Sequence, residues 1–60
     1  MKQPASVIGD WLTRIREEGK GLTPWEENFI EDLTSQFEET QSISDRQEEI
    51  LERIYAQKTP

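Results

Sequence analysis

The sequence predicts a small all-α protein, with three short helices packed as an antiparallel bundle in a single domain over residues 1–60. Apolar residues recur at spacings of three and four positions in three separate segments, which is the pattern of one buried helix face. Two of these segments begin with a capping box, an arrangement specific to helix starts. The stretches between the segments are short, so consecutive helices should be antiparallel neighbours.

The first helix is expected at about residues 4–18. Pro4 suits a first helical turn, because its missing N–H group would have no partner there. The apolar stripe of this helix consists of Val7, Ile8, Trp11, Leu12 and Ile15. Gly19 follows, and glycine tolerates the left-handed backbone with which many helices end. We therefore expect the helix to stop before Gly19 and residues 20–21 to complete a short turn.

The second helix is expected at about residues 24–38 and has the clearest start. The Thr23 hydroxyl can accept from the N–H of Glu26, while the Glu26 carboxylate can accept from the N–H of Thr23. Its apolar stripe consists of Trp25, Phe29, Ile30, Leu33 and Phe37. Residues 38–42 include no apolar side chain, and we interpret them as the exit loop.

The third helix is expected at about residues 45–57. Ser44 and Gln47 form a second capping box, and Asp45 lies near the positive end of the helix dipole. Its apolar stripe consists of Ile50, Leu51, Ile54 and Tyr55. Lys58 suits the negative end of the dipole, so the segment has appropriate charges at both ends.

The second and third helices share a sequence pattern, because residues 22–33 align with residues 43–54 at every apolar position and at both caps. Either a helical unit is duplicated, or the common chemistry of helix starts imposes the pattern. Both interpretations place an apolar residue before each cap, and we expect these residues, Leu22 and Ile43, to close the ends of the core. The centre of the core should hold Trp11, Leu12, Ile15, Phe29, Ile30, Leu33, Ile50, Leu51 and Ile54.

The composition argues against an enzyme and assigns no catalytic, metal-binding or cofactor-binding residue. The chain has no cysteine and no histidine, which removes disulfides, thiolate chemistry and the usual zinc ligands. We also expect no room for the pocket of about 300 Å³ or more that ligands usually need. A chain of 60 residues encloses only a thin core, and self-association is one way to enlarge it.

No apolar run approaches the roughly 20 residues needed to span a membrane, and the first residues do not resemble a signal peptide. We therefore expect a cytoplasmic protein without membrane contact.

The formal charge is −6, from thirteen acidic and seven basic residues, whereas nucleic-acid binders usually have a net basic footprint. Binding to nucleic acid is thus not favoured.

Acidic residues dominate the second and third helices. Such a surface either keeps the protein solvated or docks a protein partner with a basic surface. The candidate docking residues are Glu27, Glu31, Asp32, Glu48 and Glu52. Two aromatic residues at helix ends, Trp25 and Tyr55, either staple those ends or, if exposed together, mark a partner or self-association site.

An alternative function is weak binding of single-stranded nucleic acid by the first helix. Cationic and aromatic side chains together can contact phosphates and stack on bases. The candidate residues are Trp11, Arg14, Arg16 and Lys20. Trp11 also belongs to the apolar stripe, so a place in the core competes with this role.

One pattern covers about half of the chain: Leu22-Thr23-x-Trp25-Glu26-x-x-Phe29, followed by Ile43-Ser44-x-x-Gln47-x-x-Ile50-Leu51-x-x-Ile54-Tyr55. It resembles a short helical segment of small bacteriophage and prophage proteins and of accessory modules in phage DNA metabolism. The resemblance implies a phage-encoded interaction or regulatory module in the host cytoplasm, with a partner from DNA metabolism or transcription. It implies no catalytic residue.

Overall fold

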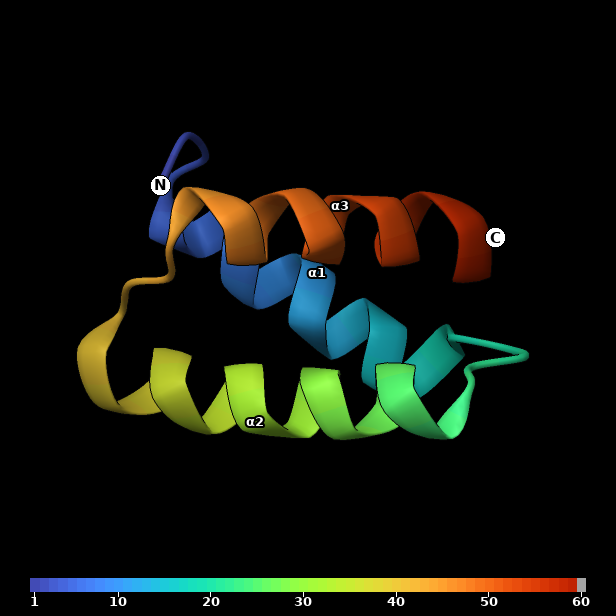
Figure 1. Ribbon diagram of the computed structural model, residues 1–60. Helices are drawn as coiled ribbons and strands as arrows, with labels where there is room; N and C mark the ends of the chain where they lie inside the picture. Colours follow the sequence, from blue (N-terminus) through green and yellow to red (C-terminus); the bar gives the residue numbers. More distant parts are fainter. Residues whose placement is uncertain (60) are drawn as a thin grey trace.

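The computed structural model describes residues 1–59 and has three helices, α1 (Ala5–Glu18), α2 (Pro24–Thr40) and α3 (Asp45–Lys58). Consecutive helices are antiparallel, and α1 runs obliquely behind the pair formed by α2 and α3 in Figure 1. The predicted all-α bundle is therefore confirmed. Among the described residues, no helix is long and apolar enough to cross a membrane.

The α1 helix ends at Glu18 as expected, but it begins one residue later than expected and the conformation of Gly19 differs. Pro4 is the N-cap and has an extended backbone, and its carbonyl accepts from the N–H groups of Val7 and Ile8. Gly19 has φ of −67°, so the predicted left-handed conformation is wrong. Glycine is needed there for space, since a Cβ would lie 2.4 Å from the carbonyl oxygen of Ile15. The left-handed glycine of this turn is Gly21, with φ of +73°.

The α2 helix is longer than expected. Glu39 and Thr40, assigned to the exit loop, belong to its last turn, and Gln41 caps the helix in the left-handed conformation with φ of 57°. The N–H of Gln41 donates to the carbonyl of Phe37 and closes the helix. Residues 38–40 are exposed, so this turn extends past the core and needs no apolar side chain. The α3 helix also ends one residue later than expected, at Lys58.

Both predicted capping boxes are confirmed. The Thr23 hydroxyl accepts from the N–H of Glu26 at 3.1 Å, and the Glu26 carboxylate accepts from the N–H of Thr23 at 2.8 Å. The Ser44 hydroxyl and the Gln47 side chain make the same two bonds, also at 3.1 and 2.8 Å. Each box satisfies two backbone N–H groups at the start of its helix and fixes the direction in which the chain enters.

The buried core lies where the three helices meet and consists of Ile8, Leu12, Ile15, Ile30, Leu33, Phe37, Ile43, Leu51 and Ile54. The prediction for its centre is wrong at three positions, because Trp11, Phe29 and Ile50 are only partly buried at its edge. Ile8 and Phe37 lie in the core instead. The Phe37 ring lies close to Gly9 of α1, where a Cβ would make an ordinary contact with it at 3.5 Å. Ile43 closes one end of the core as expected, whereas Leu22 is half-buried.

Candidate interaction surfaces

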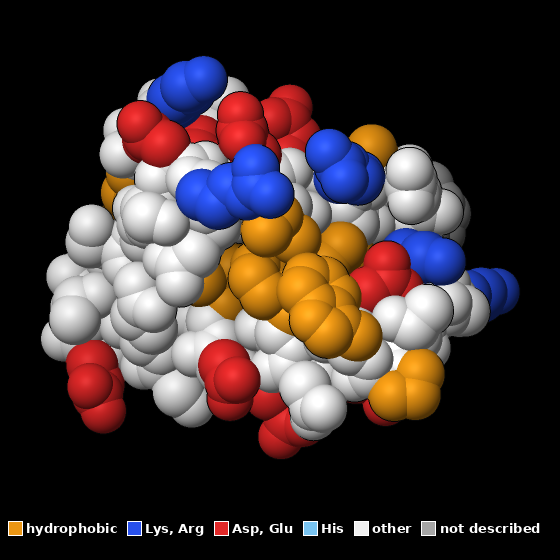
Figure 2. Space-filling model, in the orientation of Figure 1, with side chains coloured by type: hydrophobic (Ala, Val, Ile, Leu, Met, Phe, Trp, Pro, Cys, Tyr) orange, Lys and Arg blue, Asp and Glu red, His pale blue; other side chains and the backbone are white. Residues whose placement is uncertain are grey.

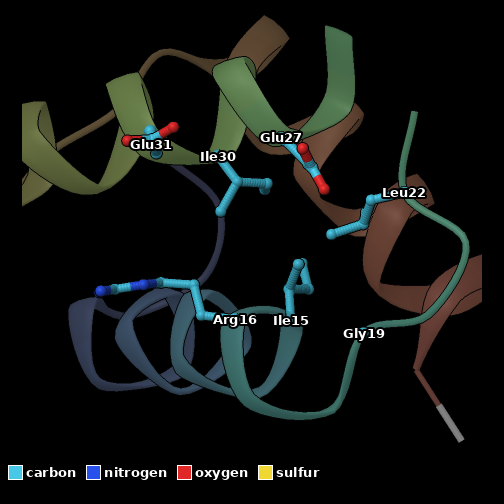
Figure 3. Close-up of a pocket in the computed structure, with 7 residues that line it drawn as sticks. All are labelled: Ile15, Arg16, Gly19, Leu22, Glu27, Ile30 and Glu31. Atoms are coloured by element: carbon cyan, nitrogen blue, oxygen red, sulfur yellow. The ribbon is translucent and has the colours of Figure 1, made fainter. Parts of the chain in front are cut away.

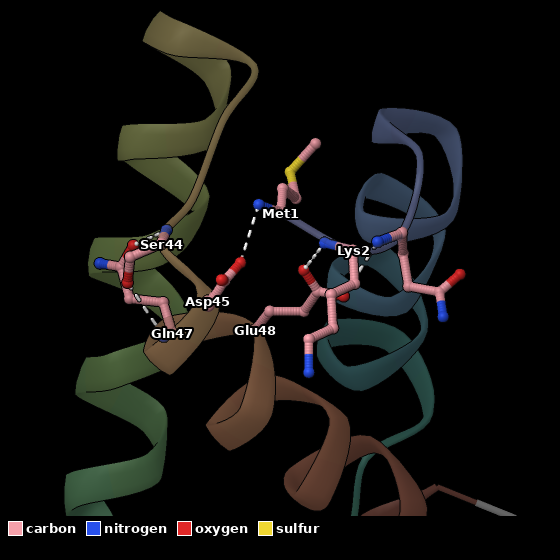
Figure 4. Close-up of polar contacts among 7 residues, drawn as sticks. Met1, Lys2, Ser44, Asp45, Gln47 and Glu48 are labelled. Carbon is pink, nitrogen blue, oxygen red and sulfur yellow. Dashed lines mark hydrogen bonds and ion pairs between the residues drawn. The ribbon is translucent and has the colours of Figure 1, made fainter.

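One residue of the expected acidic surface, Glu48, is buried, with 4% of its surface exposed. Its carboxylate accepts from the backbone N–H of Lys2 and, at 3.0 Å, from that of Gln3 (Figure 4). The amino group of Met1 donates to the neighbouring Asp45 at 2.9 Å. Glu48 therefore holds the N-terminal segment against α3 and is not available to a partner. Nothing in its sequence position distinguishes it from an exposed acid in the first turns of a helix.

The other four acidic candidates are exposed but do not form one face. Glu27 and Glu31 lie on the side of α2 that faces α1, where both line a groove. Asp32 follows Glu31 directly, so its side chain leaves α2 about 100° further around the helix. Glu52 lies on α3, one turn after Glu48, and so on a different helix from the three candidates of α2. Glu27 and Glu31 line the α1–α2 groove, and Asp32 lines a neighbouring hollow together with Glu31 and Arg16.

The groove between α1 and α2 is open and has a volume of about 370 Å³. The side chains of Ile15, Leu22 and Ile30 converge in its middle, and Glu31 and Arg16 lie toward its open end (Figure 3). Glu27 stands on the same wall as Glu31. The expectation that no such volume would exist is wrong, although the space is a surface groove and not an enclosed cavity.

The proposed nucleic-acid cluster, Trp11, Arg14, Arg16 and Lys20, is divided between different sides of the bundle. Trp11 stacks on Tyr55 of α3, with ring centroids 5.4 Å apart. Arg14 pairs with Asp10 one turn earlier, at 3.3 Å. Arg16 faces α2 and lines the acidic groove. Arg14 lies one turn after Trp11 on the same side of α1, whereas Arg16 faces α2, so the structure separates Arg16 from the aromatic ring.

The aromatic candidates Trp25 and Tyr55 lie on separate parts of the molecule, and each stacks on a different ring. Trp25 is 60% exposed and stacks on Phe29, with ring centroids 5.3 Å apart and planes 10° apart. Tyr55 is half-buried against Trp11. Figure 2 shows an apolar patch on the face formed by α2 and α3. Lys and Arg side chains lie next to it on the α3 side, with acidic ones beyond them, and Asp and Glu side chains lie on the α2 side. This patch is a second candidate surface.

The fold and these two surfaces define a small three-helix module that presents an acidic groove and a separate apolar patch. Comparison of the chain with known protein families, with curated proteins and with solved structures finds no match. Within residues 1–59, no three or more Asp, Glu, His or Cys side chains gather in a way that could hold a metal ion.

Proposed function

We propose that this chain is a protein-interaction module that binds a partner with a basic surface through the α1–α2 groove. The observation that carries the proposal is an apolar floor beside two exposed carboxylates, Glu27 and Glu31. Small-molecule sites usually enclose most of their ligand. An open groove suits an apolar side chain that projects from a protein and is held there by neighbouring contacts.

Charge supports the same kind of partner. The α2 helix carries six acidic residues and no basic one. Glu27 and Glu31 are one turn apart, so they would meet Lys or Arg side chains at a similar spacing on a partner helix. Arg16 on the opposite wall would select an acidic or polar group beside the apolar side chain. Complementary charge of this kind raises association rates and rejects wrong partners.

A role in binding rather than catalysis is supported by the lack of histidine and cysteine and by the openness of the groove. The resemblance of residues 22–29 and 43–55 to phage modules supports a basic partner from DNA metabolism or transcription. It likewise supports a phage-encoded module that works in the cytoplasm of the host.

Peptide selection tests the proposal and does not require an identified partner. Random peptides displayed on phage and selected on the immobilised chain should become enriched in an apolar residue flanked by Lys or Arg. The double variant Glu27→Lys, Glu31→Lys should lose the selected peptides. The matched control is Glu39→Lys, Glu49→Lys, which changes the net charge equally at two exposed positions away from the groove and should still bind them.

Two results would contradict the proposal: selected peptides without basic residues, or equal binding by both double variants. Circular dichroism of each variant checks that helicity is retained, so that loss of binding is not mistaken for loss of fold.

A further inference from the structure

The apolar patch on the α2–α3 face lies outside the proposed groove and is bounded at both ends by polar contacts. At one end, the amides of Gln36 on α2 and Gln47 on α3 bond to each other at 3.0 Å. At the other end, Lys58 lies 3.8 Å from the carboxylate of Glu26. These contacts show which sides of the two helices face each other.

Three apolar side chains on these sides reach the surface between the two polar ends. Trp25 is the most exposed, and Phe29 and Ile50 are each half-buried. The inner edge of the apolar patch packs against the core of the bundle, and its outer edge faces water (Figure 2). An exposed Trp stacked on a half-buried ring is the kind of rigid anchor that dominates binding at interfaces.

The two long edges of the patch carry opposite charges. On α3, Arg46 and Arg53 are exposed one turn before and one turn after Ile50, so they share its side of the helix. On α2, the exposed acids on the corresponding side are Asp32, one turn before Gln36, and Glu39, one turn after it. Figure 2 shows basic side chains directly above the patch, acidic ones further above them, and acidic ones below the patch.

We infer that this face binds a second copy of the same chain, related by a twofold axis parallel to α2 and α3. Rotation by 180° about this axis places α3 of the second copy opposite α2 of the first. Each acidic α2 edge then meets the basic α3 edge of the other copy. A twofold axis across the helices would instead join like edges. The charge pattern is therefore self-complementary in one orientation only, and the Trp25 anchors would be covered together.

The dimer should be weak. The bundle spans 27 by 19 Å, which gives this face a footprint of about 500 Å² per copy, below the roughly 800 Å² per partner of a standard specific interface. The net charge of −6 on each copy also opposes association. We therefore expect a dissociation constant in the range from about 10 µM to about 1 mM, because area at the low end goes with weak complexes.

Sedimentation equilibrium across that concentration range, at about 0.15 M NaCl, measures the association directly. The unmodified chain should pass from monomer to dimer. Trp25→Ala should weaken the dimer by about 30-fold, as expected for an anchoring aromatic residue. Glu27→Lys, Glu31→Lys, on the other side of α2, should not weaken it.

A charge exchange tests the orientation. Arg46→Glu, Arg53→Glu makes both edges acidic, and Asp32→Lys, Glu39→Lys makes both edges basic, so neither variant should dimerise alone. Mixed in equal amounts, they should form a heterodimer at least as readily as the original chain forms its dimer. Circular dichroism confirms that each variant remains helical.

A chain that stays monomeric throughout the range would overturn the inference, as would a dimer insensitive to Trp25→Ala or a failure of the two variants to associate. A monomer that loses a selected peptide on Trp25→Ala would assign the patch to a different protein. The sedimentation and mixing results do not affect the proposed function, because the groove residues Glu27 and Glu31 are unchanged in the patch variants. A selected peptide that depends on Trp25 and not on Glu27 and Glu31 would instead count against the groove.

Discussion

At the scale of single residues, Glu48 shows how a carboxylate stabilises this small fold. A buried carboxylate is costly unless its oxygens accept hydrogen bonds. The backbone N–H groups of Lys2 and Gln3 supply these bonds from more than forty residues away in sequence. The segment before α1 is thereby attached to the first turn of α3.

We predict that Glu48→Ala lowers the free energy of unfolding by about 1–3 kcal/mol, because two N–H groups lose a charged acceptor. Glu48→Gln should have a smaller effect, since it keeps one acceptor oxygen. The neighbouring exposed Glu49→Ala is the control and should stay within about 0.5 kcal/mol. Urea unfolding measures the change, and hydrogen exchange should become faster at Lys2 and Gln3. Equal stability of the Glu48 and Glu49 variants would show that these bonds contribute nothing.

The ion pair between Met1 and Asp45 predicts how stability depends on pH. The hydrogen bond from the amino group lowers the pKa of Asp45 below 3.8, and the same bond raises the pKa of the Met1 amino group above 8.0. The first shift stabilises the fold above pH 3.8 and is lost as the pH falls through the folded-state pKa of Asp45. The second stabilises it below pH 8.0 and is lost as the pH rises through the folded-state pKa of Met1.

Unfolding of the original chain and of Asp45→Asn should therefore differ most between about pH 4 and pH 8, and the difference should shrink on both sides. The effect should be small, because the pair is exposed and screened by solvent. A difference that stays constant from pH 6 to about pH 10 would mean that the amino group does not contribute.

At the scale of secondary structure, the two capping boxes define where α2 and α3 begin. We predict that Thr23→Ala and Ser44→Ala each lower the free energy of unfolding by about 1 kcal/mol, because each leaves one N–H of the first turn without its partner. The conservative exchanges Thr23→Ser and Ser44→Thr should cost a few tenths of that amount, since both keep the hydroxyl. Thermal or urea unfolding followed by circular dichroism compares them. If the alanine and conservative variants unfold alike, the caps act through something other than the hydroxyl.

At the scale of the whole molecule, stability depends on the small apolar core where the three helices meet. A domain of 60 residues has a free energy of unfolding of about 3–9 kcal/mol. Leu51 is fully buried between the helices, and its neighbour Ile50 lies at the edge of the core. A single large-to-small exchange in the centre is therefore comparable to the total stability.

We predict that Leu51→Ala costs about 2–5 kcal/mol and leaves much of the chain unfolded at 25 °C. Ile50→Ala should cost less than about 1.5 kcal/mol, because much of that side chain already contacts water. Helicity at low protein concentration, where a weak dimer is dissociated, separates the two. Similar losses in both variants would mean that Ile50 also belongs to the centre of the core.

The amino-acid sequence alone was sufficient to predict the three helices and the residues that cap α2 and α3, because capping chemistry and apolar spacing act within a few neighbouring residues. It also placed Leu12, Ile15, Leu33 and other stripe residues correctly in the core. These features depend on local geometry, which one chain segment specifies.

The packing of the three helices was needed to establish which residues of each stripe reach the centre and which surfaces the bundle presents. The path of α1 across the other helices moved Trp11 to the edge and brought Ile8 and Phe37 inside. The N-terminal segment covered Glu48, and the angle between α1 and α2 opened a groove beside Glu27. Burial of this kind is set by side chains distant in sequence, so the spacing within one helix carries no information about it.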